Sequence, residues 1–93
     1  MYALEAKTKF RKDVKRVNRR GWDLTLLTAA TDLLIESGTL PASYGAHPLS
    51  GEYKGCIDAH LKPDWVLIYE VDEDEQVVVL HRTGSHQDLF KKY

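Results

Sequence analysis

Residues 63–82 read PDWVLIYEVDEDEQVVVLHR, and this stretch decides the fold class. It contains two runs rich in aromatic and β-branched residues, 64–71 and 76–82, a composition typical of β-strands. The acidic run 70–75 lies between them and is expected to form the turn of a hairpin. Successive side chains of a strand point to opposite faces, and one face of the first run should belong to the core. The side chains expected on that face are Trp65, Leu67, Tyr69 and Val71.

Two helices are predicted before this hairpin. Apolar residues recur at helical spacing from about Thr8, and Gly21 is expected to end the first helix. Asp23 can cap a second helix, which Gly38 should end. Because the connection is so short, we expect the two helices to form a hairpin. The apolar positions are Phe10, Val14 and Val17 in the first helix, and Leu26, Leu27, Ala30, Leu33 and Leu34 in the second.

The remaining segments complete an α+β fold. A short strand is expected over residues 2–5 and another over 52–61, with a proline-containing loop over 39–51. A short helix is expected from about His86. The predicted order is β-α-α-β-β-β-α, a small antiparallel sheet covered on one face by the helical hairpin. The 93 residues should form a single domain, 1–93.

Composition excludes several classes of protein. The longest apolar run is residues 65–69, which is too short for a transmembrane helix. The N-terminal residues lack the apolar segment of a secretory signal, so we expect a cytoplasmic protein with no membrane partner. The single cysteine, Cys56, permits neither an internal disulfide nor a cysteine-based zinc site, and we expect it to be a small buried apolar residue.

Charge is unevenly distributed along the chain. The net charge is −1, yet residues 1–20 hold eight of the 13 basic residues and two acids, a charge of +6 that leaves −7 for the remainder. This asymmetry indicates a face for a polyanion or an acidic partner. The alternative is a solvated helix together with a solvated acidic turn.

The candidate catalytic residues lie in the second half of the chain. Asp58 and His60 share one face of a predicted strand, and Asp64 follows the next turn. Imidazole is the side chain best suited to proton transfer near neutral pH. With an arginine and an aromatic ring, such groups suit metal-free RNA cleavage by the RNA's own 2′-hydroxyl. The remaining candidates are His47 in the loop, Arg82 at the end of the last strand, and His86 and Phe90 on one face of the terminal helix.

Other interpretations stay open at this point. Each histidine alone could be structural. Alternatively, His47, His60 and His86 could bind a metal together with Asp58 or Asp64. Because His81 alternates with Arg82, it is expected to face away from it and to be structural. No serine lies in a nucleophile-elbow context, and no glycine-rich phosphate loop is present.

Four motifs in order resemble one family. They are HPLSGEYKG at 47–55, DAH at 58–60, PDWVLIY at 63–69 and RTGSHQDLF at 82–90. Together they resemble the YafQ-type toxins of the RelE/ParE superfamily of bacterial toxin–antitoxin systems. The resemblance implies a RelE-like fold and a ribosome-dependent mRNA endonuclease that uses no metal or cofactor. It also implies a cognate antitoxin, with which the toxin forms a higher-order hetero-oligomer.

The resemblance also assigns residues. It implies catalytic positions at His47, Asp58, His60, Asp64, Arg82 and His86. We expect His86 to be the general acid, Asp64 or His60 the general base and Arg82 the transition-state stabiliser, with His47 and Asp58 positioning their neighbours. Phe90 should stack on a base, and the other expected RNA-binding residues are Lys54, Lys9, Lys12, Arg16 and Arg19. A gyrase-poisoning protein of the ParE type, or a non-catalytic antitoxin-binding module, is the alternative.

Overall fold

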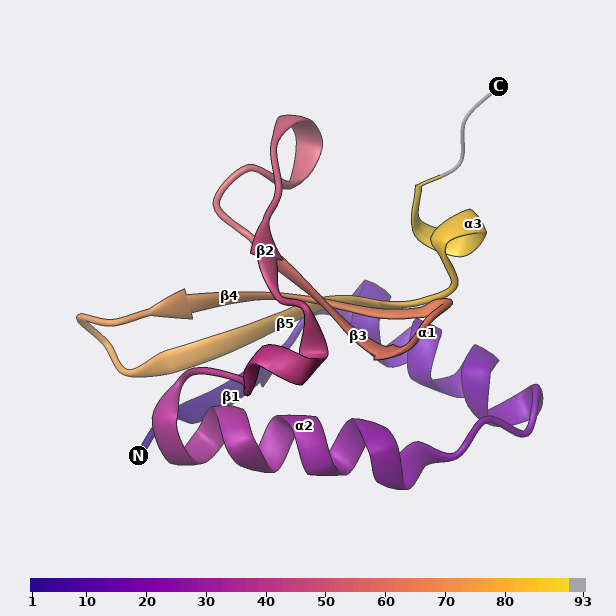
Figure 1. The fold of residues 1–93 in the computed structure, drawn as a ribbon, viewed down its shortest axis with the longest axis horizontal. Helices are drawn as coiled ribbons and strands as arrows, with labels where there is room; N and C mark the ends of the chain where they lie inside the picture. Colours follow the sequence, from indigo (N-terminus) through magenta and orange to yellow (C-terminus); the bar gives the residue numbers. More distant parts are fainter. Residues whose placement is uncertain (91–93) are drawn as a thin grey trace.

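A computed structural model describes residues 1–90 of the chain. The sheet has five strands in the spatial order β1-β5-β4-β3-β2 (Figure 1). Short 3₁₀ turns at Ala42–Tyr44 and Gly51–Tyr53 flank β2. The elements are β1 (Ala3–Ala6), α1 (Thr8–Arg19), α2 (Leu24–Ser37), β2 (His47–Pro48), β3 (Ile57–Lys62), β4 (Trp65–Asp72), β5 (Val77–Gly84) and α3 (His86–Leu89).

The predicted α+β class, helical pair and short terminal helix are confirmed, with three differences in the sheet. The edge strand β1 runs parallel to β5, whereas the other pairs are antiparallel. The predicted loop 39–51 contains the additional strand β2, which pairs with the start of β3. The strand predicted over 52–61 begins only at Ile57, because residues 51–53 form a 3₁₀ turn.

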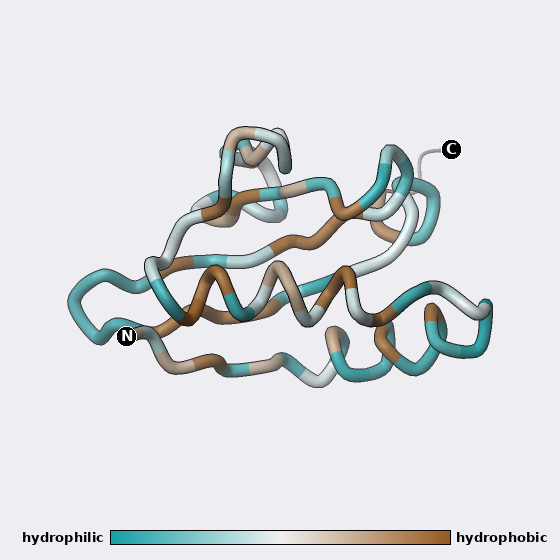
Figure 2. The backbone as a smooth tube through the Cα atoms, turned by 60° about the horizontal axis from the view of Figure 1, so that its bottom comes forward, coloured by the Kyte–Doolittle hydropathy of each residue, from teal (hydrophilic) through white to brown (hydrophobic). Residues whose placement is uncertain are grey.

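The main core lies between the sheet and the two long helices. α1 packs against β5 and α2 against β3. Trp65, Leu67 and Tyr69 are buried there as predicted, while Val71 is partly buried against the same cluster. Figure 2 shows hydrophobic residues concentrated in the central strands and hydrophilic ones in the β4–β5 turn. Buried residues from the helices are Phe10, Val17, Leu27, Ala30 and Leu34.

The opposite face of the sheet carries a smaller apolar cluster. Figure 1 shows α3 and the β2 segment on this side, away from α2. Cys56 is buried in the cluster, as the sequence predicted. The other buried members are Val66, Ile68 and Leu89, and Leu49, Tyr53 and Phe90 pack against them.

The helix boundaries follow local chemistry. The Asp23 carboxylate accepts a hydrogen bond from the Thr25 amide at 3.0 Å, which caps α2 as predicted. Gly38 ends α2 in the left-handed conformation, with φ 74°. α3 starts with a capping box, in which the side chains of Ser85 and Asp88 each accept from the backbone amide of the other. Within residues 1–90, no helix has both the length and the apolar character needed to cross a membrane.

A β-bulge in β5 overturns one expectation. Ile68 pairs with Arg82, but the next residue, Tyr69, pairs with Leu80, so His81 is an extra residue in β5. The alternation of side chains therefore fails at this point. His81 and Arg82 line the same hollow instead of facing away from each other, and the prediction for His81 was wrong in this respect.

Candidate active site

Three histidines from separate elements form a row on the face of the sheet opposite the long helices. The ring centroids of His47 and His60 are 6.3 Å apart, and those of His60 and His86 are 5.6 Å apart. Phe90 extends the row, with its ring 6.1 Å from that of His86. We call His47, His60 and His86 the histidine row. The sequence predicted a loop at His47, a strand at His60 and a helix at His86. In the structure these residues lie in β2, β3 and α3, and the fold brings them together.

Strand register explains how distant residues reach this face. His47 pairs with Asp58, Asp58 with Ile68, and Ile68 with Arg82, across four neighbouring strands. Side chains directly opposite one another in a sheet project on the same side. His60 follows Asp58 by two residues in β3 and projects on that side as well. The site is therefore built on the sheet, and α3 brings His86 to it.

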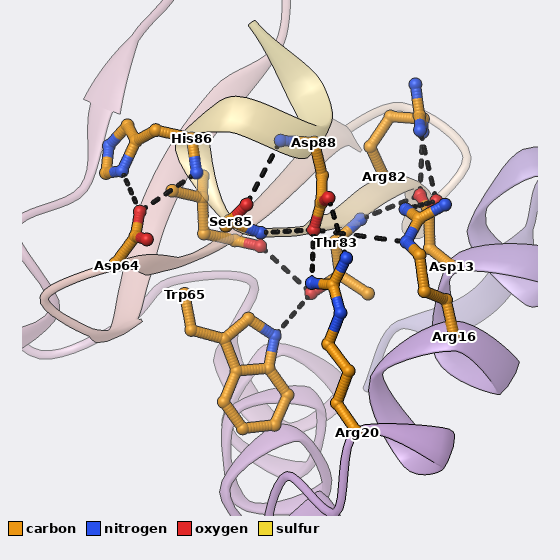
Figure 3. Close-up of polar contacts among 11 residues, drawn as sticks. Asp13, Arg16, Arg20, Asp64, Trp65, Arg82, Thr83, Ser85, His86 and Asp88 are labelled. Atoms are coloured by element: carbon orange, nitrogen blue, oxygen red, sulfur yellow. Dashed lines mark hydrogen bonds and ion pairs between the residues drawn. The ribbon is translucent and has the colours of Figure 1, made fainter.

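Asp64 orients His86. Its Oδ1 accepts the backbone amide of His86 at 3.0 Å and lies 2.8 Å from the ring Nδ1 (Figure 3). The backbone hydrogen bond, followed by the side-chain one, lowers the pKa of Asp64 below its ordinary value, so the carboxylate stays ionised at neutral pH. With Nδ1 directed at Asp64, the Nε2 atom of His86 is left for a substrate.

Asp58 and His47 make a second contact between a carboxylate and an imidazole. Asp58 is buried, and its Oδ1 lies 3.0 Å from His47 Nδ1. The contact lacks hydrogen-bond geometry, and Nδ1 is also 3.2 Å from the carbonyl oxygen of Gly45. Protonation of His47 would convert the contact into an ion pair and would compensate the buried Asp58 carboxylate.

Arg82 is held by a buried carboxylate that the sequence analysis did not single out. Its Nε and Nη2 donate to Asp13 at 2.6 and 3.0 Å, and the Thr83 amide donates to Asp13 at 3.1 Å (Figure 3). These bonds raise the pKa of Arg82, which stays charged. Its Nη1 is directed at the Tyr53 hydroxyl, 3.4 Å away. The sequence signal was an acid on the apolar stripe of α1, between Phe10 and Val17.

A second ion pair fixes α3. The guanidinium of Arg20 donates to both carboxylate oxygens of Asp88, at 2.7 and 2.9 Å. This pairing and the bonds from Ser85 hold the pKa of Asp88 well below its usual range. Arg20 also lies over the Trp22 ring, 5.4 Å from its centroid. The end of α1 therefore anchors the short helix that carries His86.

A hollow of about 470 Å³ lies beside the site on the same face. Its lining includes Arg82 and Tyr53, and three lysines, Lys7, Lys9 and Lys54. We call it the basic hollow. Of the predicted RNA-binding residues, Lys9 and Lys54 line it. Lys12 and Arg19 are exposed elsewhere on α1, and the Arg16 side chain turns toward Asp13 and Asp88.

Comparison with known proteins gives consistent matches over nearly the whole chain. The family model described as "Bacterial toxin of type II toxin-antitoxin system, YafQ" matches residues 2–91. The chain is 41% identical over 88 residues to the mRNA interferase toxin YafQ of Escherichia coli K12, and the match covers 94% of each protein.

Two solved structures extend this likeness to three dimensions. One is the toxin chain matched in a crystal structure of the E. coli DinJ-YafQ complex, with a TM-score of 0.87 and 40% identity, covering 97% of this chain and 99% of that chain. The other is a metal-bound toxin from Helicobacter pylori, with a TM-score of 0.87 and 39% identity, covering 97% of this chain and 100% of that chain.

Proposed function

The chain belongs to the YafQ family of bacterial type II toxin–antitoxin toxins, and on that premise we propose that it is an mRNA interferase, an endoribonuclease that cleaves messenger RNA. The histidine row with Asp64, on the sheet face to which strand register also brings Arg82, is the observation that carries the proposal. It supplies imidazoles for proton transfer and a permanent cation for a phosphate within one face of the sheet.

The reaction that these groups suit is attack of the RNA 2′-hydroxyl on the adjacent phosphorus. The 2′-oxygen loses its proton to a base, a bond forms to phosphorus, and the bond to the leaving 5′-oxygen breaks. The 5′-oxygen then takes a proton from an acid, which leaves a 2′,3′-cyclic phosphate on the upstream fragment. Two proton-transfer groups and one cation satisfy this scheme without a metal.

The contacts refine the expected roles. His86 suits the general acid, because Asp64 holds Nδ1 and stabilises the protonated ring while Nε2 is available. Since both bonds of the Asp64 Oδ1 go to His86, we assign Asp64 to positioning and His60 to the general base. Arg82 would face the phosphate through Nη1, because Nε and Nη2 are bonded to Asp13.

The RNA path that we propose crosses the basic hollow and the aromatic pair beside it. Phe90 packs edge-on against Tyr53, with ring centroids 6.0 Å apart, and one exposed ring face would stack on a base. Lys9 and Lys54 would neutralise phosphates next to Arg82. Arg16 is assigned to structure instead, because it is occupied by Asp13.

The partners follow from the family. A cognate antitoxin is supported by the crystallised DinJ-YafQ complex of the E. coli relative. We further propose that the substrate is mRNA on the ribosome, which places the protein in the cytoplasm, and that Lys12 and Arg19 contact ribosomal RNA or an acidic antitoxin segment. A higher-order toxin–antitoxin oligomer remains part of the proposal.

A translation reaction tests the function. Purified chain, stripped of metal with EDTA and desalted, is added to translating ribosomes, and message cleavage is mapped by primer extension. We expect ribosome-dependent cuts that His86→Ala abolishes and that Gln87→Ala, an exposed neighbour on α3, retains.

Intact message in the presence of active ribosomes would contradict the nuclease proposal. In that case a non-catalytic antitoxin-binding module or a ParE-type gyrase poison becomes the better hypothesis. Antitoxin binding and gyrase supercoiling assays would separate these two.

A further inference from the structure

Three potential metal ligands meet at the basic hollow, outside the histidine row. Cys56 precedes β3, Glu70 lies on β4, and His81 is the bulged residue of β5. One sulfur, one carboxylate oxygen and one imidazole nitrogen from these residues all lie within 4.8 Å of one another. Glu70 pairs with Val79, and His81 follows Val79 by two residues, so the side chains of Glu70 and His81 project on one face of the sheet. The bulge brings Arg82 to that face as well.

The present contacts leave the cluster open to a ligand. His81 Nε2 lies 2.9 Å from Glu70 Oε1, so imidazole and carboxylate already point at each other. Cys56 is buried, whereas the side chains of His81 and Glu70 are 22% and 47% exposed. All three line the basic hollow, through which an ion could enter.

We propose that Cys56, Glu70 and His81 bind a thiophilic divalent metal ion of the zinc class. Sulfur, imidazole and carboxylate are the three ligand types that zinc accepts in proteins. Three protein ligands and one water complete a tetrahedral zinc site. A thiol and an imidazole do not suit magnesium or calcium, which prefer oxygen.

Zinc binding requires the three ligand atoms to move only slightly closer together. Tetrahedral zinc with normal bond lengths separates its ligand atoms by about 3.3–3.8 Å. The largest separation here is at most 4.8 Å, and the partly exposed Glu70 side chain can move inward. The ion would replace the hydrogen bond between His81 and Glu70.

Charge balance also permits the ion. On binding, Cys56 releases its proton to solvent, and the thiolate and the Glu70 carboxylate together balance a divalent charge. The rim residues Lys7, Lys9 and Lys54 oppose entry of a cation. Arg82, the remaining cation of the lining, is already paired with Asp13.

The test is metal binding by the purified, reduced full chain. Zinc is titrated by calorimetry, and cobalt(II) is used as a spectroscopic substitute, because a Co–thiolate bond gives a near-ultraviolet charge-transfer band. We expect one site per chain and a thiolate band. Zinc affinity should fall by at least about tenfold in Cys56→Ser and in His81→Gln, which each remove a ligand.

Matched variants locate the ion. Glu70→Gln removes a carboxylate ligand, so it should weaken zinc binding. Because the Glu70 side chain is half-exposed, the fold should stay intact in this variant. The variant therefore tests the site even if Cys56→Ser destabilises the core. His60→Gln, in the histidine row, should keep the thiolate band and the affinity. Loss of binding only in His60→Gln would place the metal in the histidine row and overturn the proposal. No binding at micromolar zinc would overturn it as well.

Discussion

Asp64 binds His86 twice: one carboxylate oxygen accepts the backbone amide at 3.0 Å and lies 2.8 Å from the ring Nδ1. The two residues lie 22 positions apart, in the β3–β4 turn and at the start of α3. Together these contacts fix both where His86 enters the site and which ring nitrogen faces away from Asp64. Three predictions concern this site and the contacts that support it, and a fourth concerns packing at the N-terminus.

Replacing Asp64 by asparagine should reduce catalysis without unfolding the protein. The amide can still accept a hydrogen bond, but it has no charge to stabilise protonated His86. We expect kcat for message cleavage to fall by about 10²–10⁴-fold. Single-turnover cleavage on ribosomes would measure it, with Asp74→Asn in the exposed turn as the matched control. Wild-type cleavage by Asp64→Asn would contradict the role given to this contact.

Replacing Asp13 by asparagine should destabilise the fold. Asp13 is 1% exposed and is the partner of Arg82, whose guanidinium would be left without a compensating charge. Breaking a buried pair in this way costs about 3–5 kcal/mol of unfolding free energy. Urea denaturation measures the loss, and Asp32→Asn, on the exposed part of α2, should stay within about 0.5 kcal/mol. A loss as small as that of the control would refute the structural importance of the Asp13–Arg82 pair.

Stability should fall in acid through Asp88. Its pKa in the folded protein is lowered, chiefly by the Arg20 hydrogen bond, while the unfolded value is near 4. The unfolded chain therefore binds the proton first as pH falls. The stabilisation is fully present above the pKa that Asp88 has in the unfolded chain, and it is lost as pH falls through the pKa that Asp88 has in the folded protein.

The size of this effect is set by the partial exposure of the pair. The Arg20 side chain is 38% exposed, so we expect a contribution of about 1 kcal/mol. Chemical denaturation between pH 7 and the acid limit would show a shallower decline for Asp88→Asn than for the wild type. Parallel curves for the two proteins would disprove the linkage.

Two glycines form a matched pair for the packing of the N-terminal strand. Gly38 and Gly21 both have positive φ, 74° and 80°, so alanine is strained at either position. At Gly38 the new Cβ would lie 2.6 Å from the Tyr2 ring, whereas at Gly21 it meets nothing within 4 Å. Gly38→Ala should therefore lose about 1 kcal/mol more than Gly21→Ala in urea denaturation. Equal losses would show that Tyr2 moves aside at no cost.

The fold was largely predictable because its signals are local. Hydrophobic periodicity, Asp23 and Gly38 defined the second helix, and the run of aromatic and β-branched residues from Trp65 identified the central strand. The short strand β2 was missed because two residues, one of them a proline, carry no periodic signal. Its pairing with β3 depends on partners nine and 11 residues further along the chain, Ile57 for Pro48 and Asp58 for His47.

The site was predictable in its residue types but not in its contacts. The motifs identified His47, His60 and His86, and the fold places their rings in a row. Two ion pairs escaped the sequence analysis, those of Asp13 with Arg82 and of Arg20 with Asp88, since their partners are separated by 69 and 68 residues. The resemblance assigned Arg82 to the transition state, and charge patterning placed Arg20 among the bases expected to face solvent or a polyanion.

By itself, then, the sequence determined the class of fold, the order of its main elements and the residues able to transfer protons, because propensity, periodicity and motif are properties of neighbouring residues. Only the tertiary structure decided the parallel edge strand, the bulge at His81 and the carboxylates that His47, His86 and Arg82 contact. These depend on register and on long-range pairing, which arise when separate elements pack and bury their polar groups together.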